Sequence, residues 1–353
     1  QVSKLITTTT AGSQSVEYNT ESVDLTAVVS PVPSGGNITF YVEDILAGNA
    51  AVNTSTGEAV CTFNPSSLPV GTYTIRAEYS GSGIFLPGSS NPLHNGTLTV
   101  TSQTLTWTGN ISNDWSDAAN WSPNVLPSAV NNVHIPDVAN DPKINNQLLN
   151  NPAVCNDLDI ETGAVLTIAS GNALTVNGTL SNPGGNASFL IHSGGSLIEN
   201  SGAPATVQRA IGADEWHFIS PPVSNAQSAQ FTGRYLQNFD ESTYSYSDII
   251  SLTENLAPMR GYALWGDNGF TASLSGTLNA GSISIPVTRN NLLEVPKYPG
   301  WNLVGNPYPS SVDWNEVSGW TKTNVNATIY IHIDATKWAT YNTSSGETNG
   351  GSN

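Results

Sequence analysis

Short apolar pairs recur along the middle of the chain, between residues 156 and 197. The pairs are Leu158/Ile160, Leu166/Ile168 and Leu174/Val176, which follow one another at a spacing of 8 residues. Side chains alternate between the two faces of a strand, so each pair predicts a short strand with one apolar face. Gly163 and Gly171 lie in the gaps, where glycine lets the backbone turn. The pattern predicts a strand repeat and excludes a helix.

Two architectures suit this repeat: a short parallel β-helix with about three such strands per coil, or a meander of hairpins. The β-helix is favoured, because the turns at Gly163 and Gly171 lack the Asn-Gly or Asp-Gly pair that two-residue hairpins prefer. A stack of few coils exposes its core at both ends and needs caps. The flanking segments are therefore expected to supply these caps.

The first hundred residues alternate apolar and polar positions in short runs, separated by clusters of Pro, Gly and Ser. This pattern predicts a β-sandwich over residues 1–102. The expected strands are Val23–Val29, Asn37–Val42, Ala59–Phe63, Thr72–Tyr79 and Gly96–Thr101.

Two stretches of this segment resemble the bacterial Ig-like repeats of secreted surface proteins. They read VDLTAVVSPVPSGGNITFYV and LPVGTYTIRAEYSGSGIFLPGSS. The resemblance implies that Tyr73 and Tyr79 pack in the core, and that the domain extends or presents its neighbour.

Residues 103–151 combine tryptophans with Asn, Ser and Pro, and two interpretations remain open. Trp107, Trp115 and Trp121 offer large, rigid faces on which sugar rings could stack, as does Trp265 further along. Alternatively, the first three tryptophans fill the junction beside the first coil. The segment resembles the W-x-G, D-W-S, N-W opening of β-helical modules in large secreted Bacteroidetes proteins, which supports a cap.

Asp157, Asp159 and Glu161 alternate with apolar residues, so their three carboxylates are expected on the outward face of one strand. Rigid strands hold carboxylates at fixed separations, which suits an acid/base pair or a weak calcium site. The ordinary alternative is a solvated edge of an acidic protein. That alternative is favoured, because no second carboxylate row follows on the next coils.

From residue 205 onward the predicted strands become longer and richer in aromatic residues, which predicts a C-terminal β-sandwich over 205–353. ATVQRAIGADEWHFISPPVS, MRGYALW and GWNLVGNPYPSSVDW resemble the module that follows the β-helix in Bacteroidetes surface proteins, many of them type IX secretion cargo. The resemblance implies a further apolar strand, so the module is expected to lack its last strand. His217 is interpreted as a hydrogen-bonded strand residue, and Asn302 and Asn306 as turn residues that bond the main chain.

Composition narrows the classes of function. Charged residues make up 10% of the chain and the net charge is −17, with 10 Lys and Arg. This excess of acid argues against nucleic acid and anionic membrane surfaces as partners. Cys61 and Cys155 lie in different predicted modules, so both are expected to be buried free thiols. Because the sequence starts at Gln1 without a signal peptide, we expect a processed protein or an excised fragment.

The sequence thus predicts an all-β protein with an Ig-like sandwich (1–102), a Trp-rich cap and short parallel β-helix (103–204) and a C-terminal β-sandwich (205–353). We expect a non-catalytic, secreted structural or adhesion protein of the cell surface, with no cofactor and no membrane insertion. Its partners would be its own copies, other surface proteins or neutral glycans. Two alternatives stay open: a fibre subunit that exchanges the strand QVSKLITTTT, and a glycan-binding accessory module of a polysaccharide-degrading enzyme.

Overall fold

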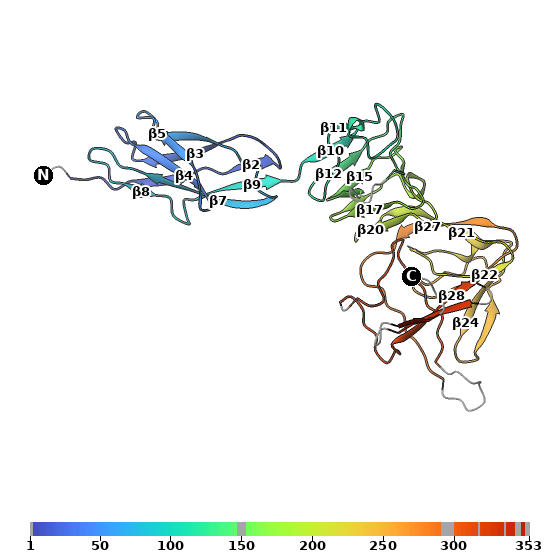
Figure 1. The fold of residues 1–353 in the computed structure, drawn as a ribbon. Helices are drawn as coiled ribbons and strands as arrows, with labels where there is room; N and C mark the ends of the chain where they lie inside the picture. The colour runs from blue at the N-terminus through green and yellow to red at the C-terminus, as the bar shows by residue number, and fades with distance from the viewer. Residues whose placement is uncertain are drawn as a thin grey trace. The chain divides into compact units, whose positions relative to one another are not determined.

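The computed structural model describes residues 3–146, 153–290, 300–316, 318–334, 337–342 and 347–349. Internal contacts divide the chain into two units, residues 1–104 and 105–353 (Figure 1). The described residues form strands and three short 3-10 helices, so the prediction of an all-β fold is confirmed. None of these helices has the length and apolarity that crossing a lipid bilayer requires, within the described part of the chain.

The first unit is a two-sheet sandwich. A three-stranded sheet has the order β1-β3-β6, and a six-stranded sheet has the order β2-β9-β7-β4-β5, with β8 beside β7. The strands are β1 (Thr8–Ala11), β2 (Gln14–Glu17), β3 (Val23–Ser30), β4 (Asn37–Val42), β5 (Ile45–Ala51), β6 (Glu58–Phe63), β7 (Gly71–Tyr79), β8 (Gly88–Ser89) and β9 (Gly96–Thr101). All the expected strands are present, each within one residue of its predicted ends. β5 was missed, because its Ala, Gly and Asn residues carry little strand signal.

The N-terminal strand of this unit corrects one expectation. The segment QVSKLITTTT was proposed as a free strand that another copy could accept. Instead, β1 pairs antiparallel with β3, and Leu5 forms a bridge with Phe85. Thr9 is fully buried. From Leu5 onward this segment is already part of the sandwich, because its alternating residues complete the sheet of β3.

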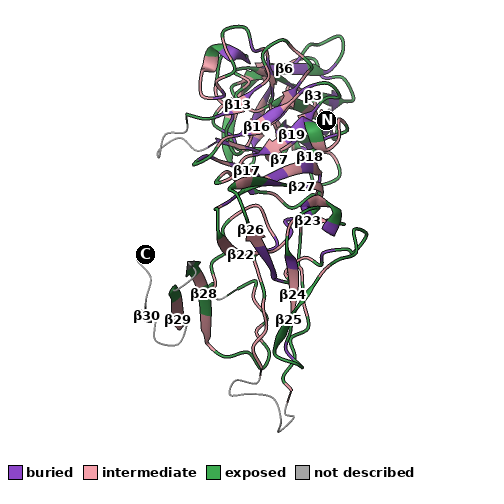
Figure 2. Ribbon diagram, turned by 90° about the vertical axis from the view of Figure 1, so that its right-hand side faces the viewer, coloured by how far each residue is buried: buried purple, intermediate pink, exposed green. Residues whose placement is uncertain are grey.

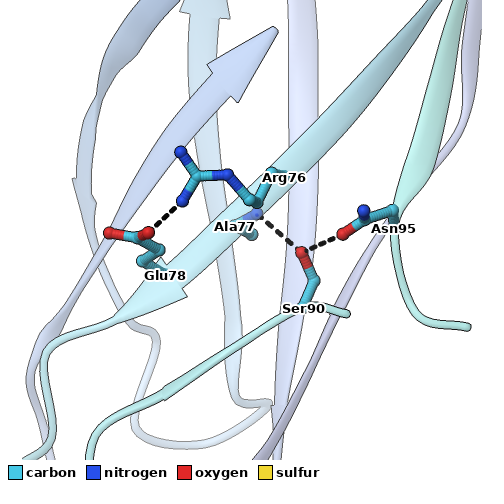
Figure 3. A network of polar contacts seen from close by, with 5 residues as sticks. All are labelled: Arg76, Ala77, Glu78, Ser90 and Asn95. Carbon is cyan, nitrogen blue, oxygen red and sulfur yellow. Dashed lines mark hydrogen bonds and ion pairs between the residues drawn. The ribbon is translucent and has the colours of Figure 1, made fainter. Parts of the chain in front are cut away.

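Polar side chains tie the loops of the sandwich to its strands. Tyr79 is buried and donates a hydrogen bond to the carbonyl of Gly35 at 2.6 Å, while the Tyr73 hydroxyl donates to Pro69 at 2.7 Å. Both tyrosines thus contact the core, as the resemblance implied. The Ser90 hydroxyl accepts a hydrogen bond from the Ala77 amide at 2.9 Å and donates to Asn95 at 2.6 Å, beside the Arg76–Glu78 ion pair (Figure 3).

The second unit begins with β10 (Thr104–Trp107), whose first residue lies at the boundary between the units, and continues as a parallel β-helix. Three sheets form its sides, and Leu158 pairs in parallel with Val133 before it and Leu180 after it. The strands are β11 (Trp121–Ser122), β12 (Asn132–Ile135), β13 (Lys143–Ile144), β14 (Ala153–Cys155), β15 (Leu158–Ile160), β16 (Leu166–Ile168), β17 (Ala173–Val176), β18 (Leu180–Ser181), β19 (Phe189–Ile191) and β20 (Ser196–Ile198). The short 3-10 helices η1 (Ala118–Asn120) and η2 (Asn186–Ser188) lie between strands.

The parallel registers confirm the β-helix and exclude the meander. The three apolar pairs of one coil lie on β15, β16 and β17, one on each side of the helix. Each of these side chains is at most 1% exposed. The spacing of 8 residues therefore corresponds to one strand and one corner. At one corner, Gly163 has φ +101° and a Cβ there would lie 2.5 Å from a carboxylate oxygen of Asp137, so glycine is required.

One sheet of the β-helix continues into the C-terminal part of the chain. β21 (Pro204–Ile211) pairs in parallel with β19 and antiparallel with β27 (Phe270–Leu278), and β23 (Val223–Ser224) follows. The resulting six-stranded sheet has the order β13-β16-β19-β21-β27-β23. Figure 1 shows β21 and β27 side by side at the end of the coils. The boundary expected at 204/205 falls inside β21, and the sheet does not break there.

Two further sheets complete the C-terminal part. One has the order β22-β26-β24-β25 and the other β28-β29-β30. Their strands are β22 (Glu215–Ile219), β24 (Leu236–Asp240), β25 (Ser245–Asp248), β26 (Tyr262–Gly266), β28 (Thr328–Asp334), β29 (Lys337–Asn342) and β30 (Glu347–Asn349), and η3 (Ser228–Phe231) is a 3-10 helix. The Phe218 ring lies 4.9 Å from His332 and 5.8 Å from Trp338, between the two sheets. The absence of a last strand stays a prediction.

Candidate functional site

The three acidic residues on and beside β15 are engaged by neighbouring groups. The Asp159 and Glu161 carboxylates lie 3.2 and 3.3 Å from the two ring nitrogens of His134. Asp157 accepts hydrogen bonds from the amide and hydroxyl of Thr179 on the next coil, at 2.7 and 2.9 Å. No group of three His, Cys, Asp or Glu side chains among the described residues has the arrangement of a metal site. The three acidic residues therefore hold adjacent coils together.

Of the two interpretations of the tryptophans at 107, 115 and 121, the structure supports the one in which they fill the junction beside the first coil and contradicts stacking on sugars. Trp107, Trp115 and Trp121 are 0%, 5% and 1% exposed. The Trp121 ring meets the rings of Trp107 and Trp115 edge to face, at 5.0 and 4.7 Å. Their faces are covered by each other and by the first coil, because aromatic rings bury large apolar area at a cap.

Trp265 differs from the other three. It is partly exposed on β26 and lies 5.5 Å from Trp216, its cross-strand neighbour on β22. The role of Trp265 in glycan stacking stays a prediction. Nearby, His217 lies 3.3 Å from the carbonyl of Gly212 and 3.4 Å from the Glu215 carboxylate, as expected for a hydrogen-bonded strand residue.

The two most distinctive C-terminal motifs, ISPPVS and GWNLVGNPYP, meet at a buried asparagine. The Asn279 amide donates to the carbonyl of Pro221 in the first motif at 2.9 Å and to that of Pro307 in the second at 2.8 Å. A Cβ at Gly305 would lie 2.6 Å from the Ser220 Cβ, so glycine permits the close approach. Asn306 accepts from the Tyr308 amide at 3.0 Å, which confirms its role as a turn residue. Sequence reasoning missed Asn279, because it lies outside both motifs.

A cleft of about 450 Å³ opens where these motifs meet the last coil. We call it the motif cleft. Its base is apolar and consists of Val207, Ala272 and Leu274. The remaining lining residues come from the β19–β20 turn, β21, β22 and the second motif: Gly194, Gly195, Ser196, Gln208, Arg209, Phe218, Ile219, Ser220, Pro222, Val304, Gly305, Asn306, Tyr308, Pro309, Ser310 and Ser311. Arg209 is the only charged side chain among these lining residues.

A second cleft, of about 750 Å³, is organised by Glu241. One Glu241 carboxylate oxygen accepts from the amides of Asn290 and Gly300, each at 2.8 Å, and the other accepts from the Thr288 hydroxyl at 3.0 Å. These hydrogen bonds, led by that from Asn290, hold the pKa of Glu241 below its ordinary value. Asn302 adds hydrogen bonds with the Thr288 main chain, as a turn residue should. The sequence pattern offered no signal for Glu241.

Comparison with known families divides the chain near residue 104, as the internal contacts do. A model described as a domain of unknown function (DUF8693) matches residues 106–349. The chain belongs to the DUF8693 family. A model of the bacterial Ig-like domain (group 3) matches residues 8–101. No curated protein and no solved structure matches the chain.

The DUF8693 match runs from the tryptophan cap to β30 without a break. It therefore includes the β-helix, the motif cleft and the Glu241 cleft in one family unit, as the continuous sheet does. The Ig-like match supports a multi-module protein of the surface type and fits a cell-surface or structural role. An all-β chain with such a domain is compatible with an extracellular location.

Proposed function

We propose that this chain is a non-catalytic structural protein of the cell exterior, in which an Ig-like domain is followed along the chain by a DUF8693 unit that resists deformation as one body. The six-stranded sheet β13-β16-β19-β21-β27-β23 carries this proposal. Its hydrogen bonds connect the coils directly to the C-terminal strands, so separating the two parts requires breaking the β19–β21 ladder.

The polar side chains support a structural role as well. Asn120, Glu241 and Asn279 are buried. Glu241 and Asn279 each bond main-chain groups of two separate segments, and Asn120 accepts from the amides of Ile111 and Ser112. Asparagine and glutamate used in this way hold loops in place rather than act on a substrate. The same holds for Asp157, which bridges two coils.

Single-molecule pulling tests the structural part of the proposal. With handles at the two ends of the chain, we expect two unfolding events, one for the Ig-like domain and one for the whole DUF8693 unit. Release of the C-terminal strands in an event separate from the coils would contradict a unit that resists force as one body. The full chain with its first handle moved to residue 105 serves as the control, because the pull then bypasses the Ig-like domain and should show only the DUF8693 event.

Two assays test the absence of catalysis and the location at the cell exterior. Incubation with neutral and acidic polysaccharides, peptides and esters is expected to give no turnover, and any turnover above a heat-denatured control would contradict the non-catalytic role. Antibody against the purified chain is expected to label intact cells that produce the parent protein. Labelling only after lysis would contradict the location.

A finer part of the proposal concerns the export route. The GWNLVGNPYP motif resembles modules of Bacteroidetes surface proteins, so we place the parent protein among type IX secretion cargo. Deleting a core component of that system in the producing organism should then leave the protein inside the cell. Normal surface display in the deletion strain would contradict this route.

A further inference from the structure

The motif cleft carries an arginine that pairs with no acidic side chain in the described part of the chain. Arg209 is exposed and forms no ion pair with any described residue. In contrast, Arg76 pairs with Glu78, and Arg234 lies 4.1 Å from the Phe270 ring centre. The Arg209 guanidinium is therefore free to bind an anion from outside.

Arg209 is also held on a rigid element. It lies in β21, opposite Ala272 of β27, within a register that pairs all eight residues of β21. A planar guanidinium on a fixed strand can bind a carboxylate through two parallel hydrogen bonds. Such a site discriminates between a carboxylate and a neutral group of similar size.

The rest of the cleft suits a sugar ring. Its apolar base and the Phe218 ring offer a surface for the C–H face of a pyranose. The hydroxyls of Ser196, Ser310 and Ser311 line the cleft and form no hydrogen bond within the described part of the chain. They are available to sugar hydroxyls. The volume of about 450 Å³ lies within the range of roughly 300–1,000 Å³ typical of small-ligand sites.

The cleft is formed before any ligand arrives. The Tyr308 hydroxyl donates to Gly281 at 2.6 Å, and the Leu197 amide donates to Pro309 at 3.2 Å. Together with the Asn279 bonds, these contacts fix the segment that forms one side of the cleft. A fixed site loses less entropy on binding. The Leu197–Pro309 bond also occupies the edge of β20, which disfavours a peptide that would add there as a strand.

We propose that the motif cleft binds a carboxylated sugar, of the uronic acid type, within an extracellular glycan. The carboxylate lies on Arg209, the ring packs against the apolar base and Phe218, and the serine hydroxyls bond the sugar hydroxyls. This site goes beyond the proposed function, which stands whether or not the cleft binds a glycan.

Calorimetry with a matched pair of oligosaccharides tests the proposal. The probes are a trisaccharide of galacturonic acid and the corresponding trisaccharide of galactose, which lacks the carboxylates. We expect the full chain to bind the acidic probe, with an affinity that falls as salt rises, and to bind the neutral probe at least about 10-fold more weakly. Equal affinity for both probes, or no binding of the acidic probe, would overturn the proposal.

Two pairs of variants locate the site. Arg209→Gln should weaken binding of the acidic probe about 10- to 100-fold, whereas Arg234→Gln, the same change outside the cleft, should leave it unchanged. Ser311→Trp should block the cleft without a change of charge, whereas Ser247→Trp on β25 should not. If binding survives both Arg209→Gln and Ser311→Trp, the cleft is not the site.

A competition experiment separates sugar from peptide. A tetrapeptide of glutamate presents carboxylates without a sugar ring, so it should compete poorly with the acidic trisaccharide. If it binds with equal affinity, the sugar assignment is wrong. Thermal melting of every variant confirms that the fold is retained, and the Ser311→Trp pair decides the question if Arg209→Gln unfolds.

Discussion

The coils of the β-helix and the C-terminal part of the DUF8693 unit are stabilised in different ways. In the coils, short strands stack apolar side chains that are almost completely buried, such as Leu166 and Leu174. In the C-terminal part, long segments are held by individual polar side chains, above all Glu241 and Asn279. Figure 2 shows the contrast: buried residues follow β16 and β19, whereas β28 and β29 carry exposed and intermediate ones.

The six-stranded sheet β13-β16-β19-β21-β27-β23 thus joins a part stabilised by apolar stacking to a part stabilised by polar side chains. Coil stacking repeats the same contact, so each apolar residue adds to a common core and its removal destabilises the whole stack. A buried polar side chain such as Glu241 or Asn279 makes its hydrogen bonds at one place only, and its removal leaves buried donors or acceptors without partners. We therefore expect larger effects on global stability from the coils and local, pH-sensitive effects from the C-terminal part.

The largest effect is expected at the tryptophan cap of the coils. Trp121→Ala removes a ring that is 1% exposed and contacts two other tryptophans. Because a cavity remains, the free energy of unfolding of the DUF8693 unit should fall by about 3–5 kcal/mol in chemical denaturation. Trp265→Ala is the control and should cost less, since Trp265 is partly exposed. An equal cost at the two sites would contradict a buried cap.

A smaller effect is expected where the two motifs meet. Asn279→Ala leaves the buried carbonyls of Pro221 and Pro307 without their donor, which should lower the free energy of unfolding by about 1–3 kcal/mol. Asn268→Ala, at an exposed turn, is the matched control and should change it little. If Asn279→Ala behaves like the control, the two motifs are not held together by this side chain.

A pH-dependent effect is expected at the Glu241 cleft. The pKa of Glu241 is lowered from 4.5 on folding, so its carboxylate stabilises the fold above that value and this stabilisation is lost as the pH falls through the folded pKa. Limited proteolysis should thus cut near Thr288 and Gly300 faster below about pH 4.5 than at pH 7.

Glu241→Gln separates this carboxylate from the other acids of the chain. The variant should be cut faster at pH 7 and should lose most of the difference between pH 7 and pH 4, because the amide does not titrate. Asp248→Gln is the control, since Asp248 lies on the exposed β25 and should keep the wild-type profile. An unchanged profile in Glu241→Gln would assign the pH dependence to other groups.

The smallest effect is expected at the thiol inside the coils. Burial, with the nearby charge of Asp157, raises the pKa of Cys155 to about 12. The thiol is therefore neutral and shielded at pH 8, and iodoacetamide should label it only after unfolding. Mass spectrometry of folded and denatured samples measures this. Rapid labelling in the folded protein would mean that the coil opens without global unfolding.

The sequence by itself determined the local parts of this fold. The apolar pairs at a spacing of 8 residues specified the strands and corners of a coil, since the residues that define a strand and its turn are neighbours in the chain. The alternation of the Ig-like segment likewise placed its main strands. Even the roles of Asn302 and Asn306 could be predicted, because each side chain bonds main chain close by or within its own motif.

Only the tertiary structure decided the long-range parts. It buried Trp107, Trp115 and Trp121, placed β1 in its own sandwich, and extended a β-helix sheet through β21 across the expected boundary. It also assembled the motif cleft around Arg209 from five separate segments. These outcomes depend on contacts between residues far apart in the chain, and neither periodicity nor turn chemistry encodes which distant segments pack together.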